Sequence, residues 1–94
     1  MTIAQTILSQ IKTIDPRALW AWGAKDFVNT GDGLRFKTSG MTPWKGYVEI
    51  KLDEGKDLYK IKFFRIRKFE VKVDCELEDV YADCLVSFID EMVG

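Results

Sequence analysis

The sequence has 94 residues, enough for one small domain, so we expect residues 1–94 to form a single globular unit. It contains no histidine, which excludes histidine-based triads, histidine zinc sites and acid–base catalysis by imidazole. The 14 basic and 15 acidic residues give a net charge of −1, so no overall field points to a polyanionic partner.

Residues 2–14 have the pattern of an amphipathic helix. Four isoleucines recur at spacings of four, four and three and share one face of that helix: Ile3, Ile7, Ile11 and Ile14. Thr2 and Gln5 fit a capping box, in which each side chain satisfies a backbone N–H group of the first turn. The dipeptide at residues 15–16 ends the helix, because proline disfavours helical geometry in the residue before it.

Residues 18–28 allow two interpretations. The apolar run at residues 19–22 favours a short strand, since its two tryptophans suit a pleated sheet and Gly23 lies where a turn or bulge would follow. The alternative is a second short helix that has Pro16 at its first position.

Alternating apolar and polar residues predict the strands that come next. A hairpin is expected from residues 27–28 and 34–37 around a glycine-containing turn, with Leu34 and Phe36 facing the core. After a loop at residues 39–46 and a polar turn at residues 53–57, alternation continues in three segments: residues 47–52, 58–64 and 69–75. The alternation changes phase at residues 65–68, which indicates a bulge or a turn, and we favour a turn or a sharply bent continuation between two strands.

Residues 79–93 are predicted to form a C-terminal amphipathic helix with an acidic first turn. Its apolar side comprises Val80, Tyr81, Cys84, Leu85, Phe88, Ile89 and Met92. The expected fold is therefore α+β: an antiparallel sheet of about four to five strands flanked by an N-terminal and a C-terminal helix, in the order α-β-β-β-β-β-α. Both helices are expected to cover one face of the sheet.

The two cysteines and the N-terminus indicate the compartment. Cys75 and Cys84 are too few for a disulfide scaffold, so we predict two free thiols in a reducing cytosol, with a disulfide bridge as the alternative. Residues 1–14 lack the features of a signal peptide, and no stretch approaches the roughly 18 apolar residues that a membrane span needs. A soluble cytoplasmic protein is expected.

Charge is polarised along the second half of the chain. Residues 56–72 contain seven basic and two acidic residues, whereas residues 74–91 contain seven acidic residues and no basic one. One interpretation is that these runs are the solvated faces of a sheet and a helix. The other is a bipolar binding surface that complements a charged partner.

The candidate partner-binding residues are Trp44, Arg35, Lys60, Lys62, Arg65 and Arg67. Trp44 follows Pro43 in the predicted loop, where it either folds back onto the edge of the core or forms an exposed anchor for a partner. A nucleic-acid-binding module is the alternative function, with Tyr47 as a stacking group on a basic sheet face. That face would comprise Arg35, Lys37, Lys51, Lys60, Lys62 and Arg65.

The sequence offers no convergent set of catalytic groups, so we expect a protein that is not an enzyme and has no cofactor or metal. The glycines at residues 31–33 are not followed by the lysine and hydroxyl residue of a phosphate-binding loop. The acidic turn at residues 53–57 contains a lysine and lacks the distal glutamate of a calcium loop.

Four stretches of the chain carry a family resemblance when they are taken together: residues 2–8, 23–28 with 33–37, 48–52 with 58–59, and 80–83. In this combination the chain resembles small uncharacterised proteins of bacteriophages and other bacterial mobile elements. The resemblance implies a binding protein that occludes a bacterial host protein, as an anti-defence or anti-CRISPR-like inhibitor does, and it assigns no site residue.

Overall fold

The computed structural model describes residues 2–40 and 44–93. Five strands form one antiparallel sheet in the order β1-β2-β3-β4-β5, so each strand lies beside the next one in the chain. The elements are α1 (Ile3–Ile14), α2 (Ala18–Trp22), β1 (Ala24–Asn29), β2 (Gly33–Thr38), β3 (Tyr47–Asp53), β4 (Leu58–Arg67), β5 (Glu70–Val80), the 3-10 helix η1 (Ala82–Cys84) and α3 (Leu85–Val93). The predicted α+β fold is confirmed.

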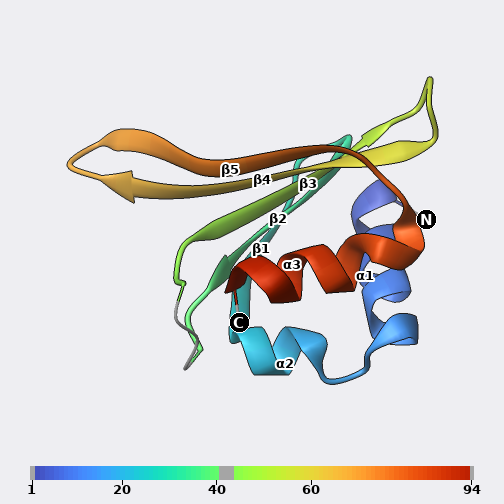
Figure 1. Ribbon diagram of the computed structural model, residues 1–94, viewed down its shortest axis with the longest axis horizontal. Coiled ribbons are helices and arrows are strands. Elements are labelled where there is room, and N and C mark those ends of the chain that lie inside the picture. The colour runs from blue at the N-terminus through green and yellow to red at the C-terminus, as the bar shows by residue number, and fades with distance from the viewer. Residues whose placement is uncertain (1, 41–43, 94) are drawn as a thin grey trace.

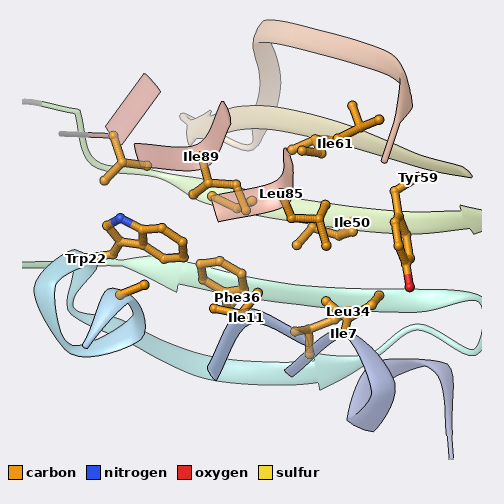
Figure 2. Packing of buried hydrophobic residues seen from close by; sticks show 14 of the residues in the cluster. Ile7, Ile11, Trp22, Leu34, Phe36, Ile50, Tyr59, Ile61, Leu85 and Ile89 are labelled. Atoms are coloured by element: carbon orange, nitrogen blue, oxygen red, sulfur yellow. The ribbon is translucent and has the colours of Figure 1, made fainter. Parts of the chain in front are cut away.

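The helices lie together on one face of the sheet, and the core fills the space between the two layers (Figures 1 and 2). We call the opposite face, which no described helix covers, the outer face. The largest fully buried side chains come from the three α-helices and the three central strands: Ile7, Ile11, Trp22, Leu34, Phe36, Val48, Ile50, Ile61, Phe63, Leu85, Ile89 and Val93.

Helix α1 follows the sequence prediction closely. The Gln5 backbone N–H donates to Thr2 Oγ1 at 3.1 Å, and the Thr2 N–H donates to Gln5 Oε1 at 2.9 Å, which is the predicted capping box. Ile7 and Ile11 are buried, but Ile14 is 44% exposed, so its assignment to the core stripe is wrong. It is the last residue of α1, where the chain turns away towards α2.

Residues 18–22 form a helix, so the favoured strand interpretation is wrong and the alternative is correct, although the helix begins two residues after Pro16. Gly23 ends α2 with a φ of 63°, and its N–H is bonded to the carbonyls of Leu19 and Trp20. The helical turn points Trp22 into the core and leaves Trp20 85% exposed. Two tryptophans separated by one residue suit either geometry, and packing of Trp22 against Phe36 favours the helix.

The β1–β2 hairpin is confirmed, and Leu34 and Phe36 are buried as predicted. The ends of the loop after β2 are held together, because the Thr38 backbone N–H donates to the Gly46 carbonyl at 2.8 Å and the Gly46 N–H donates to Thr38 Oγ1 at 3.1 Å. Residues 41–43 of this predicted loop, including Pro43, lie outside the described residues.

The phase change at residues 65–68 leads into a turn, as favoured, and β5 has a bulge further along the chain. The turn between β4 and β5 is at Lys68 and Phe69, both with positive φ, as in tight hairpin turns that match the twist of the strands. The bulge is in β5: Phe63 pairs with Cys75 and Phe64 with Val73, so Asp74 is an extra residue.

The C-terminal helix begins later than predicted, so the start at residue 79 is wrong. Strand β5 continues to Val80, which is buried opposite Tyr59, and the helical turns begin only at residue 82. Val80, an apolar residue of the sheet, was thus wrongly assigned to the apolar side of the C-terminal helix. Tyr81 and Phe88, also assigned to that stripe, are exposed, because the buried face of α3 comprises Leu85, Ile89 and Val93.

Cys75 and Cys84 are both free thiols, partly buried against the core. Cys75 is on β5, and Cys84 lies on η1.

Candidate binding surface

The distal half of the β4–β5 hairpin projects beyond the rest of the sheet. Strand β3 begins at Tyr47, opposite Phe64, so the last three residues of β4 pair only with β5. We call residues 65–73 the arm. In Figure 1 its turn lies at the far left, away from the three helices.

One side of the arm is apolar and uncovered. Ile66 pairs with Val71 and Phe64 with Val73, which puts these side chains on the outer face of the sheet, opposite to Phe63. Ile66, Val71 and Val73 are 51%, 62% and 46% exposed. Phe69, at the turn, is fully exposed. Alternation in the sequence identifies a strand with an apolar side, but it does not reveal that this side is left unburied.

The apolar side of the arm begins at a pair of stacked rings. Phe64 is buried, and the ring of Tyr47 stacks on it with 5.3 Å between centroids and 12° between planes. Lys37 Nζ lies over the Tyr47 ring, 5.9 Å from its centroid. The Tyr47 ring already contacts both residues, so it does not provide an open stacking platform.

An open hollow of about 710 Å³ lies between the arm and the start of β3. The described residues that line it are Lys37, Lys45, Gly46, Tyr47, Arg65, Ile66 and Arg67. Four of them are cations and none is a carboxylate, so we call this feature the basic hollow.

A polar cluster fixes the base of the arm to the core. Asp74 Oδ2 accepts a hydrogen bond from Trp44 Nε1 at 2.9 Å, and the Arg65 guanidinium forms an ion pair with the same carboxylate, with Nε–Oδ2 at 2.6 Å and Nη2–Oδ1 at 3.1 Å. The Trp44 ring packs edge-on against Phe63 with 5.7 Å between centroids. Trp44 therefore folds back onto the edge of the core, as the first of its two interpretations states.

The hydrogen bond from Trp44, followed by the one from Arg65, lowers the pKa of Asp74 below its ordinary value. A carboxyl whose pKa is lower in the folded state stabilises the fold above the pKa of the unfolded chain, and this contribution is lost as the pH falls through the folded-state pKa. Asp74→Asn is therefore expected to lower the melting temperature at pH 7 and to make its decline below about pH 4 shallower. Thermal unfolding monitored by circular dichroism from pH 7 to pH 2 measures both effects.

Glu54→Gln, in the exposed turn after β3, is the matched control for removal of one carboxylate. It should keep the melting temperature and its decline with pH close to those of the wild type. An Asp74→Asn variant that follows the wild-type curve would show that the cluster does not stabilise the base of the arm.

The predicted basic face of the sheet is compensated by acidic neighbours. Lys60 Nζ is 3.7 Å from Glu78 Oε1, and Lys62 lies directly opposite Glu76. Arg35 is likewise paired across the strands with Glu49, whose carboxylate is 3.2 Å from Lys51 Nζ. Much of the basic run thus lies on β4 beside the acidic residues of β5, and their charges interleave across the two antiparallel strands.

The structure divides the six candidate residues into two groups. Arg65 and Arg67 line the basic hollow, and Trp44 is joined to Arg65 through Asp74. The other three, on the outer face of the sheet, lie apart from it among glutamates: Arg35, Lys60 and Lys62. Sequence analysis named Lys37 and Tyr47 only for the nucleic-acid alternative, and it did not select the other residues of the hollow and arm: Lys45, Ile66, Phe69, Val71 and Val73. These residues come together only because β4 continues for three residues past the start of β3, and no local sequence pattern encodes that difference in strand ends.

No protein-family model matches the chain, and no curated protein or solved structure with significant similarity to it was found. Within residues 2–40 and 44–93, no group of three or more cysteine, aspartate or glutamate side chains is placed to hold a metal ion. No described helix is both long and apolar enough to cross a membrane.

Proposed function

We propose that the protein is a small, non-enzymatic binding protein that occludes a surface of another protein, with the arm as its contact element. The observation that carries this proposal is the uncovered apolar side of the arm, formed by Ile66, Val71 and Val73 with Phe69 at the turn. A contiguous exposed apolar surface on a small domain commonly marks an interaction site. The proposal that the partner is a bacterial host protein, blocked in an anti-defence or anti-CRISPR-like manner, rests on the resemblance to phage and mobile-element proteins.

The composition of the arm supports a protein partner. Aromatic residues and arginine are enriched among the residues that dominate protein–protein binding energies, and the arm carries both Phe69 and Arg67, which are exposed. The cluster around Asp74 holds the base of the arm against the core, which reduces the ordering cost when a partner binds.

The alternative of a nucleic-acid-binding module receives less support. It needs an uncompensated basic sheet face and an available aromatic ring. Lys60 is paired with Glu78, Lys62 faces Glu76, and the ring of Tyr47 is already stacked on Phe64. The distribution of charges and rings therefore favours a protein surface.

A photo-crosslinking amino acid placed at position 69 tests the proposal, with the same amino acid at position 20 as the control. Both positions are highly exposed aromatic residues, but Trp20 lies on α2, outside the arm. In bacterial lysate, the probe at position 69 is expected to give a discrete protein adduct that the probe at position 20 does not give. Excess wild-type protein should suppress the adduct, and excess of a Phe69→Ser, Val71→Ser double variant should not.

The same adducts from both positions, or none from position 69, would contradict the proposal. A nuclease-sensitive adduct at position 69 would assign the arm to the nucleic-acid alternative.

A further inference from the structure

We infer that the basic hollow receives carboxylates from an extended acidic segment of the partner protein. This inference rests on the proposed function and adds the chemistry of the partner. The segment would carry aspartate or glutamate side chains next to apolar ones, so that the two kinds of side chain contact the hollow and the arm at the same time.

The positive charge of the hollow is available to a ligand. Of its four cations, Arg65 is paired with Asp74, and Arg67 lies opposite Glu70 on β5. Lys37, Lys45 and Arg67 form no ion pair with a described carboxylate. Lys45 and Arg67 are also exposed. Cations that are not held in an ion pair can attract carboxylates and fix the register of a partner.

The hollow and the apolar side of the arm share a residue, which indicates how an occupant would be arranged. Ile66 lines the hollow and also pairs with Val71 on the apolar side. An occupant that fills both must therefore present carboxylates and apolar side chains within a few residues of each other. A protein segment can do so, whereas a nucleic-acid backbone presents phosphates without adjacent aliphatic groups.

An extended segment fits because no strand in the described part of the chain covers the adjacent edge of β4. Residues 65–67 pair with β5 on one side, and no described strand pairs with them on the side where β3 has ended. Backbone groups at such an edge can add a further strand, and the side chains of that strand then provide specificity.

A second copy of the chain is a poor occupant of the hollow. In a two-fold contact between arms the same patch faces itself, so Lys37, Lys45 and Arg67 of one copy would approach those of the other. Like charges placed opposite one another disfavour such a pairing. The charge pattern thus favours a partner of opposite sign.

The probe for this inference is a synthetic hexapeptide of alternating glutamate and valine, titrated into isotopically labelled protein and followed by NMR. We expect shifts of the backbone amides of Lys45, Tyr47, Ile66 and Arg67. A peptide with glutamine in place of glutamate should bind the wild-type protein about fivefold more weakly, because each exposed ion pair contributes only modestly. The Lys45→Gln, Arg67→Gln double variant should bind the original acidic peptide more weakly by the same factor. The matched control is the Lys60→Gln, Lys62→Gln variant, which removes the same charge from the sheet and should bind like the wild type.

Three results would overturn the inference: no shifts at millimolar peptide, equal losses in the two double variants, or tighter binding of a thymidine octanucleotide to the same amides. Sedimentation of the protein alone tests for self-association. A dimer that the Arg67→Gln substitution dissociates would assign the hollow to a second copy of the chain, and this result would also overturn the inference. The two proposals fail separately. A partner crosslinked at position 69 that binds Lys45→Gln, Arg67→Gln with unchanged affinity would leave the proposed function standing and refute the acidic segment.

Discussion

Replacing Trp22 with alanine is expected to lower the free energy of unfolding by about 3–5 kcal/mol, as truncation of a buried tryptophan typically does. The side chain is fully buried, and its ring lies parallel to that of Phe36 with 6.2 Å between centroids. Its Nε1 donates to Asp90 Oδ1 at 3.2 Å, so the residue connects α2, β2 and α3. The loss is measured by equilibrium unfolding in urea.

Trp20→Ala is the control for this prediction. Trp20 is on the same helix but is 85% exposed, and substitutions at exposed positions usually change stability by no more than about 0.5 kcal/mol. Equal losses in the two variants would contradict the helical geometry of residues 18–22.

Leu85→Ala should lower the free energy of unfolding by about 2–5 kcal/mol, because it leaves a cavity in a well-packed core. Leu85 is fully buried and begins the inner face of α3, which Ile89 and Val93 continue. The loss should appear as a lower urea midpoint with an unchanged denaturant slope, which indicates a change in stability and not in the surface exposed on unfolding.

Ser87→Ala, on the exposed side of α3, is the matched control and should leave the urea midpoint nearly unchanged. A Leu85→Ala variant as stable as Ser87→Ala would mean that α3 does not pack on the sheet through this face.

Elements that depend on local patterns were predictable from the sequence. The capping box of Thr2 and Gln5 requires only residues three apart, and the alternation in β3 and β4 reflects a sheet with one buried face. These signals were sufficient to predict an antiparallel sheet between terminal helices. They come from interactions within one element or between adjacent ones.

The incorrect boundaries share a physical cause, which is that tertiary contacts override a short pattern. Trp22 is compatible with a strand or a helix until its contact with Phe36 is known. Val80 continues the apolar spacing of α3, yet it pairs with Tyr59 in the sheet. The bulge at Asp74 moves the alternation in β5 from one face of the sheet to the other, and the unbroken spacing of Val71, Val73 and Cys75 gives no sign of it.

The candidate site was predictable only in part, because charges that are separated in the sequence meet in the sheet. Residues 56–72 and 74–91 are oppositely charged runs, but pairing of β4 with β5 places Lys62 opposite Glu76 and so compensates much of the polarity. The cations Lys45 and Arg67 come together in the hollow only because β4 extends past the start of β3. That offset depends on strand length and register, which the alternation leaves open.

The central claim is that the arm is the contact element, and the affinity of two variants for the crosslinked partner tests it most directly. By isothermal titration calorimetry, the Phe69→Ser, Val71→Ser double variant should bind the partner at least about tenfold more weakly than the wild type, equivalent to about 1.4 kcal/mol. Trp20→Ser, which removes an equally prominent aromatic side chain from α2, should retain wild-type affinity. Wild-type affinity of the arm variant, or an equal loss in Trp20→Ser, would contradict the account.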